Sequence, residues 1–290
     1  MSIVIKNLSK TFEDGNKALD DVSIEFKKGQ ITGLIGFNGS GKTTTFNILS
    51  RFLEKYEGQV SFDGKPLDRE ILRSISYLSA GAEPKNPDKV MSHLLYVARL
   101  HKLKKADVMP KINKMAKALE FEGFLNSPIK KLSKGNQQKI KIISSLLNPN
   151  MKYLFLDEPF DGLDPIMVKK VVKLFTVLKD VTILITSHRM EVVQEMCVEF
   201  YVLMNGILID ARRTDDKTIR VAVNKELPIA EIKKLKYVVS AKKDNNETII
   251  ILDEIKNFKA LNKKVLAMQK FEYIGIKEKN IASSVFEGYQ

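Results

Sequence analysis

The sequence has a single cysteine, Cys197, among its 290 residues. One cysteine excludes an internal disulfide framework and a zinc site built from several cysteines. Long apolar runs are also missing, because the longest, such as 181–185 and 249–252, fall far short of the roughly 18–20 residues that a membrane helix needs. The first residues, MSIVIK, have no basic flank followed by a long apolar segment, so they predict a strand rather than a signal peptide. We therefore expect a cytosolic chain.

Arginine is scarce, although the chain is strongly basic. The formal net charge is +13, and only 8 of the 48 basic residues are arginine. Proteins that read a nucleic-acid sequence depend on bidentate arginine contacts to the bases. A lysine-rich chain is also suited to an anionic membrane surface. We therefore expect no nucleic-acid partner.

Apolar periodicity predicts an α/β fold. Strands alternate with helices, and this order favours a parallel sheet covered by helices. The expected strands are 3–5, 22–26, 31–35, 58–62, 74–78, 153–156 and 181–186, of which the first three form a β-rich start. The expected helices are 43–53, 165–178 and 189–196. The pattern is also helical over 87–147, with breaks at Pro110 and Pro128, and its last helix is 134–147.

The pattern changes after about residue 205. Segments then follow in the order β-α-β-β-α-β, which is similar to the split βαβ arrangement of ferredoxin-like domains. The expected strands are 218–223, 237–241, 248–252 and 271–276, and the expected helices are 228–236 and 255–265. We therefore expect two domains, 1–205 and 206–290, of which the second is a small α+β domain.

A glycine-rich loop carries the strongest chemical signal. Residues 36–44 read GFNGSGKTT, which satisfies GxxxxGK(S/T) directly after a predicted strand and at the start of a predicted helix. Glycine allows backbone conformations that bring successive N–H groups and the helix N-terminus toward one anion. Lys42 supplies a positive charge for the β- and γ-phosphates, and the Thr43 hydroxyl is suited to ligate Mg²⁺. The sequence therefore predicts a nucleotide-binding loop.

A buried strand is predicted to end in two carboxylates. Residues 153–158 read YLFLDE, so an apolar run ends at Asp157 and Glu158. Ligands of open parallel sheets bind at the carboxyl ends of the strands. Asp157 is suited to hold Mg²⁺ beside the loop, and Glu158 is suited to orient or deprotonate a water. The alternative is that the pair only caps the next helix.

Together these motifs resemble the ATP-binding subunits of ABC transporters over roughly residues 1–205. Residues 132–138, LSKGNQQ, are similar to the family signature LSGGQ, and 161–164, DGLD, are similar to its D-loop. His188 resembles the switch histidine of the family, and Phe12 lies where an aromatic residue stacks on adenine. Without the family, Ser133 is a helix N-cap, His188 is a structural residue and Phe12 is a core residue.

The resemblance implies a P-loop NTPase core with an N-terminal antiparallel β subdomain and a helical subdomain over about 84–148. It implies ATP and Mg²⁺ as cofactors, with Thr43 and Asp157 at the metal and Lys42, Glu158 and His188 as catalytic residues. The implied nucleotide-binding residues are Phe12, Gly36, Asn38, Gly39, Ser40, Gly41, Lys42, Thr43, Thr44, Ser133, Gly135, Asp161 and Asp164. In the family, Ser133 and Gly135 touch the γ-phosphate across a dimer interface.

One position departs from the family pattern. Counting from Tyr77, the glutamine that completes Mg²⁺ coordination in the family aligns with Ala80. The alanine side chain can neither ligate the metal nor contact a partner subunit. Ser79, Glu83 or a water are the groups that would substitute. Slow hydrolysis or altered coupling to transport is therefore one expectation, although Glu158 and His188 are retained.

The resemblance implies the motor subunit of an exporter that works through a separate integral-membrane permease at the cytoplasmic face of the cell membrane. A second ATP-binding subunit, identical or different, would complete the dimer. Similar signatures and C-terminal tails occur in exporters of drugs, lantibiotics and amphipathic peptides of the phenol-soluble-modulin type. Two alternatives stay open: a catalytically weak subunit that binds ATP and gates a partner's site, and a non-transport protein that acts on ribosomes or DNA.

Overall fold

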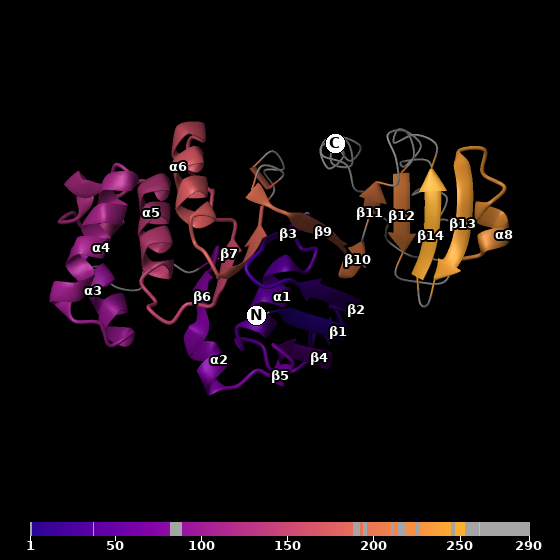
Figure 1. Ribbon diagram of the computed structural model, residues 1–290, viewed down its shortest axis with the longest axis horizontal. Coiled ribbons are helices and arrows are strands. Elements are labelled where there is room, and N and C mark those ends of the chain that lie inside the picture. The colour runs from indigo at the N-terminus through magenta and orange to yellow at the C-terminus, as the bar shows by residue number, and fades with distance from the viewer. Residues whose placement is uncertain are drawn as a thin grey trace.

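The computed structural model of the chain describes residues 2–36, 38–81, 89–187, 192–193, 196–209, 211–213, 219–223, 227–244, 247–252 and 261. Its larger part is built on two sheets, with a group of helices at one end of the view and a third sheet at the other (Figure 1). Within these residues, no helix is both long and apolar enough to cross a lipid bilayer.

The central sheet has the strand order β10-β9-β3-β8-β7-β6. Its strands are β3 (Ile31–Ile35), β6 (Ile75–Leu78), β7 (Tyr153–Asp157), β8 (Thr182–Thr186), β9 (Glu199–Met204) and β10 (Ile207–Ile209). All pairings are parallel except that of β10 with β9. Every residue of β7 and β8 is buried, which explains their continuous apolar sequences, because helices and a second sheet cover both faces. The predicted α/β class is confirmed.

The N-terminal strands form an antiparallel sheet in the order β2-β1-β4-β5. They are β1 (Ile3–Thr11), β2 (Lys17–Phe26), β4 (Glu57–Phe62) and β5 (Lys65–Pro66). Helix α1 (Lys42–Leu49) shares one apolar core with this sheet and the central sheet. The ring of Phe46 on α1 lies 5.6 Å from that of Phe155 on β7. α1 ends before the predicted residue 53, because Arg51 has a left-handed backbone conformation with φ 59.

The remaining helices of this part are α2 (Arg69–Ser74), α3 (Val90–Leu100), α4 (Lys105–Ala118), α5 (Lys134–Ser145) and α6 (Pro165–Thr176). The predicted helix break at Pro110 is wrong, since Pro110 lies inside α4. Proline leaves the carbonyl of Ala106 without its helical donor. Both residues are exposed, so water can satisfy that carbonyl, while Val108 and Ile112 anchor the opposite face in the core. Of the predicted helix 189–196, only residues 192, 193 and 196 are described, and all three are helical.

The third sheet has the order β11-β12-β14-β13 and is antiparallel. Its elements are β11 (Ala211–Arg213), β12 (Ile219–Val223), α8 (Ile229–Ile232), β13 (Val238–Asp244) and β14 (Glu247–Leu252). Because β14 lies between β12 and β13, these two strands run in the same direction, as a split βαβ unit requires. The predicted strand 271–276 lies outside the described residues, as does the predicted helix 255–265 apart from Leu261. β10 belongs to the central sheet, so the change of sheet comes after Ile209.

Candidate functional site

The glycine-rich loop joins β3 to α1, and Phe37 is its one residue outside the described part. Gly39 and Gly41 have φ 83 and φ 104, a region that other residues rarely adopt. Gly36 and Gly41 are also tightly enclosed. A Cβ on Gly36 would lie 2.1 Å from the Leu203 carbonyl oxygen, and one on Gly41 would lie 2.4 Å from that of Ala18. Steric contact therefore requires glycine at both positions.

Backbone hydrogen bonds fix the position of the loop. The N–H of Gly206, in the turn between β9 and β10, donates to the Ser40 carbonyl at 3.1 Å. The N–H and hydroxyl of Thr45 both donate to the Gly41 carbonyl, at 2.8 and 3.0 Å. The Ser40 hydroxyl is buried and makes no hydrogen bond within the described residues. A buried polar atom without a partner is unfavourable, so this loop is suited to a polar ligand.

The ammonium group of Lys42 lies at the centre of the loop. Nζ donates to the Gly36 carbonyl at 2.7 Å, and the residue is 6% exposed. Burial lowers the pKa of Lys42, and the charges of Glu158 and Asp157 act in the opposite direction. The two carboxylates therefore favour the cationic form that a phosphate needs.

Asp157 connects three elements of the site. Its side chain is 1% exposed and accepts two hydrogen bonds, from Thr43 Oγ1 to Oδ2 at 2.9 Å and from Thr186 Oγ1 to Oδ1 at 2.6 Å. Sequence reasoning missed Thr186. The available signal was its position at the end of β8, because the carboxyl ends of neighbouring parallel strands lie at the same sheet edge. Asp157 and Thr186 are in register.

Glu158 has an unusual backbone conformation at the end of β7. Its φ is 49, although the following residue is Pro159, and residues before proline usually have φ near −120 ± 40°. Its N–H donates to the carbonyl and to the hydroxyl of Thr186, at 3.2 and 3.0 Å. The chain therefore turns sharply where the second carboxylate is placed.

These residues surround one hollow of about 260 Å³. It is lined by Phe12, Asn16, Ala18, Asn38, Gly39, Ser40, Gly41, Lys42, Thr43, Thr44, Ala80, Asp157 and Glu158. The structure thus brings together the glycine-rich loop, the acidic pair, Phe12 and Ala80, and it adds Asn16, which sequence reasoning missed. Phe12 is half-buried beside the hollow, with Lys10 Nζ 5.1 Å from its ring centroid, and is not a core residue.

Four predicted residues lie elsewhere in the same chain. Ser133 is the N-cap of α5 and accepts a hydrogen bond from the N–H of Asn136 at 3.3 Å. Asp164 is the N-cap of α6 and accepts from the N–H of Met167 at 2.9 Å. Gly135 lies against the 161–164 loop, since a Cβ on Gly135 would lie 2.4 Å from the Gly162 carbonyl oxygen.

The last of the four, Asp161, donates its N–H to the Glu158 carbonyl at 3.2 Å. None of these four residues lines the hollow of its own chain. His188, the predicted switch histidine, lies outside the described residues.

The sequence is similar to those of known proteins. The family model described as ABC transporter matches residues 19–161. YhaQ of Bacillus subtilis, an uncharacterized ABC transporter ATP-binding protein, is 38% identical over 70% of this chain and 68% of its own. The chain belongs to the ABC transporter ATP-binding family. As an ABC ATPase, it hydrolyses ATP in a reaction coupled to transport.

Solved structures of ABC cassettes resemble it closely. The ATP-binding cassette MJ0796, solved as a dimer in a post-hydrolysis state bound to ADP and phosphate, is 25% identical. The match has a TM-score of 0.63 and covers 70% of this chain and 95% of that one. CbiO1 of Clostridium perfringens, part of the ABC transporter complex CbiONQ, is 27% identical with a TM-score of 0.60, covering 72% and 86%. The ABC cassette fold therefore covers the part of the chain that holds the hollow.

Proposed function

We propose that the hollow binds Mg²⁺-ATP and that this chain drives export through a separate membrane permease. One observation carries the proposal: Lys42, Thr43 and the acidic pair line a single hollow with the glycine-rich loop. The triphosphate lies along residues 36–44, where the backbone N–H groups and the start of α1 attract anions. Adenine stacks on Phe12 at the edge of the same hollow.

The oxygen atoms at the mouth of the loop suit Mg²⁺. Thr43 Oγ1 and Asp157 Oδ2 lie 2.9 Å apart, and Mg²⁺ prefers oxygen ligands from one or two protein groups together with waters and phosphates. These two residues would hold the ion, which supplies charge neutralisation for the phosphates. No group of three or more His, Cys, Asp or Glu suited to a metal occurs in the described part of the chain.

The remaining chemistry belongs to Glu158 and His188. Glu158 lines the hollow, where its carboxylate orients the attacking water and accepts a proton from it. His188 holds the γ-phosphate from the other side, as the resemblance to the family implies. The main source of rate enhancement is the fixed array of N–H donors and Lys42 around the transferred phosphoryl group.

A second subunit completes the site. Ser133 and Gly135 lie outside the hollow of their own chain, at the exposed start of α5. In the proposed dimer they close over the γ-phosphate bound by the other subunit, together with the 161–164 loop. The dimeric structure of MJ0796 supports this arrangement. ATP then acts as a bridge between subunits, and hydrolysis opens the dimer.

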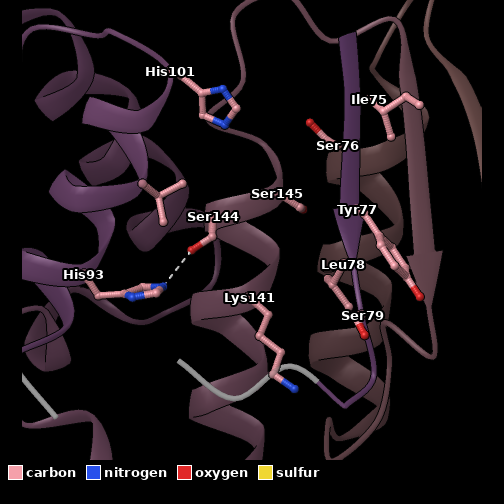
Figure 2. A pocket seen from close by; sticks show the side chains of 11 residues that line it. Ile75, Ser76, Tyr77, Leu78, Ser79, His93, His101, Lys141, Ser144 and Ser145 are labelled. Carbon is pink, nitrogen blue, oxygen red and sulfur yellow. Dashed lines mark hydrogen bonds between the residues drawn. The ribbon is translucent and has the colours of Figure 1, made fainter. Parts of the chain in front are cut away.

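A groove between β6, α3 and α5 supports the proposal of a permease partner, because it offers a site where such a partner can dock. This groove has a volume of about 280 Å³. Figure 2 shows the side chains that line it, with His93 and His101 at one wall, Lys141 and Ser144 on α5, and Tyr77 on β6. No acidic side chain lines it within the described residues. On the same helix α3, Tyr96 and Leu100 are exposed, which adds apolar surface for a partner.

A cytoplasmic loop of the permease docks in this groove, which places the chain at the cytoplasmic face of the membrane. The assignment of CbiO1 to a transporter complex supports such a partner. The cargo is a drug, a lantibiotic or an amphipathic peptide of the phenol-soluble-modulin type, as the family resemblance implies. The C-terminal residues form an accessory α+β domain that begins after β10. Ala80 favours one competing function, a weak ATPase that gates a partner's site, and turnover by the purified chain separates the two.

Replacement of Glu158 tests the proposed cycle. Glu158→Gln keeps the size of the side chain but removes the base, so it should abolish turnover and trap an ATP-bound dimer. Size-exclusion chromatography with Mg²⁺-ATP measures the dimer, and phosphate release measures turnover. Glu122→Gln, which alters an exposed carboxylate outside the hollow, is the matched control. A monomer under all conditions contradicts dimer closure, and unchanged turnover contradicts the role of Glu158.

A further inference from the structure

The buried side chain of Gln138 on α5 contacts the backbone beside the acidic pair. Gln138 is 6% exposed. Its amide Nε2 donates to two successive carbonyl oxygens, that of Glu158 at 3.2 Å and that of Pro159 at 3.0 Å. Removal of this buried amide is costly, because the Pro159 carbonyl would lose its Gln138 donor and the Glu158 carbonyl would lose one of its two, keeping the N–H of Asp161. The Gln138 amide therefore fixes the peptides that flank Pro159.

The segment that Gln138 holds is conformationally unfavourable. Glu158 has a positive φ, which is unfavourable for a non-glycine residue, and it precedes a proline, which restricts the backbone further. Such a conformation persists only where the surroundings impose it. Thr186 holds the N–H of Glu158 from one side, and Gln138 holds its carbonyl from the other. Hydrogen bonds thus hold both the N–H and the carbonyl of Glu158.

Gln138 lies on a face of α5 that contacts three segments of its own chain, at Glu158, Gly162 and Ala80. Gly135, Gln138 and Lys141 are three residues apart, so they share one side of the helix. Gly135 packs on the Gly162 carbonyl, and Lys141 Nζ donates to the Ala80 carbonyl at 3.1 Å. The helix that begins with Ser133 therefore contacts the Glu158 segment and the Ala80 segment of its own chain.

We propose that Gln138 is a positioning residue for ATP hydrolysis, which sets the direction of the Glu158 carboxylate through the Glu158 and Pro159 carbonyls. The proposal rests on the proposed role of Glu158 as the group that orients water. It follows that movement of α5, when Ser133 engages a second subunit, changes the position of Glu158 in the same chain. Gln138 thereby connects the contact of Ser133 with the second subunit to the Glu158 carboxylate of the same chain as Ser133.

The test compares Gln138 with its neighbour Gln137, using the full chain. Gln137 lies on the same helix, but its amide donates to the Ile129 and Leu132 carbonyls, at 3.5 and 3.1 Å. We expect Gln138→Leu to lower kcat by roughly 10- to 100-fold, since displacement of a catalytic group by about 1 Å has effects of this size. The KM for ATP and the Kd for a fluorescent ATP analogue should change by less than about threefold, since ground-state binding is retained. Gln137→Leu should leave kcat near the wild-type value, and an equal kcat for both leucine variants would overturn the proposal.

A second variant covers the case in which Gln138→Leu fails to fold. In Gln138→Glu the ionised carboxylate cannot donate to the carbonyls, whereas the protonated acid donates through its O–H. Burial raises the pKa of an introduced carboxyl group, so the donor returns as the pH falls. We expect the ratio of variant to wild-type kcat to rise between pH 8 and pH 6, by roughly tenfold if the pKa is shifted into this range. The same ratio for Gln137→Glu should stay flat. A flat ratio for Gln138→Glu, with the introduced carboxyl shown by ¹³C NMR to titrate between pH 6 and pH 8, contradicts the proposal.

The Glu158→Gln variant separates the two possible failures. If Glu158→Gln retains turnover, the proposed role of Glu158 is wrong and the positioning role of Gln138 is wrong with it. If Glu158→Gln abolishes turnover while the Gln138 variants behave like the Gln137 variants, only the positioning role is wrong.

Discussion

The hydroxyl of Thr186 donates to Oδ1 of Asp157 at 2.6 Å, which joins the ends of β8 and β7 at the floor of the nucleotide hollow. The same hydroxyl oxygen accepts the N–H of Glu158 at 3.0 Å. Because Thr186 occupies Oδ1, the other oxygen of Asp157 is directed to Thr43. One buried hydroxyl thus orients both carboxylate residues, and it assigns the two oxygen atoms of Asp157 to different partners.

Removal of this hydroxyl should affect both stability and rate. In Thr186→Val, Asp157 loses a donor and Glu158 loses an acceptor, so the free energy of unfolding should fall by about 1–3 kcal/mol. We expect kcat for Mg²⁺-ATP to fall by roughly tenfold or more, since the Asp157 carboxylate and the Glu158 backbone each lose one of the hydrogen bonds that position them. Urea unfolding and phosphate release measure the two effects. Thr186→Ser keeps the hydroxyl and should resemble wild type, so equal behaviour of the Val and Ser variants would contradict this prediction.

Lys42 should be required for nucleotide binding. Its ammonium is the buried cation of the glycine-rich loop, and Lys42→Ala removes that charge from the place where the β- and γ-phosphates are proposed to lie. We expect calorimetric titration with Mg²⁺-ATP to give no measurable binding. Lys179→Ala, which removes an exposed lysine outside the hollow, should bind ATP as the wild type does. Unchanged binding by Lys42→Ala would exclude the loop as the phosphate site.

Two substitutions at Ser133 separate its structural role from its proposed contact with phosphate. Asp caps helices about as well as Ser, whereas Ala costs about 1 kcal/mol. Ser133→Asp should therefore keep the wild-type Tm, and Ser133→Ala should lower it. The added carboxylate would repel the γ-phosphate of the second subunit, so Ser133→Asp should prevent the dimer that Glu158→Gln otherwise forms with ATP. A stable ATP-bound dimer of the Ser133→Asp, Glu158→Gln double variant would restrict Ser133 to capping.

A glutamine at position 80 should increase turnover. Ala80 lines the nucleotide hollow, so a longer amide at this position can reach the proposed metal. We expect Ala80→Gln to raise kcat severalfold, with phosphate release at saturating Mg²⁺-ATP as the measurement. Ala80→Met is the matched control, since it adds a side chain of similar length without the amide. If neither variant raises kcat, another group already fills the role of the missing glutamine.

Local segments could be predicted from the sequence, because neighbouring residues determine them. The strand at 31–35, the glycine-rich loop and the start of α1 follow one another along the chain, and each carries its own signal. The break at Pro110 was predicted wrongly, because exposure of the freed carbonyl and burial of the opposite helix face depend on tertiary packing. Ser133 is an N-cap, one of the two interpretations that the sequence allowed.

The contacts that orient the site could not be predicted in the same way. Thr186 and Gln138 approach Glu158 from β8 and α5, 28 and 20 positions away along the chain. Gln138 ends the stretch 132–138 that resembles the family signature, but nothing in that stretch indicates a contact with the Glu158 backbone. The Thr43–Asp157 contact spans 114 positions of the chain, and it could be predicted because two separate motifs have a shared chemistry. A shared role in binding Mg²⁺ thus predicts that Thr43 and Asp157 meet. The residues that hold the site in position, Thr186 and Gln138, depend on how the whole fold packs.

The turn at Gly206 connects the third sheet to the glycine-rich loop along the main chain. Its N–H supports the Ser40 carbonyl, its own carbonyl accepts the N–H of Asp20, and β10 and then β11 follow within a few residues. Tension applied to the third sheet, for example by a neighbour that binds it, would pull on this turn along the main chain. Mechanical load on that sheet would thus be transmitted to the Ser40 carbonyl of the glycine-rich loop.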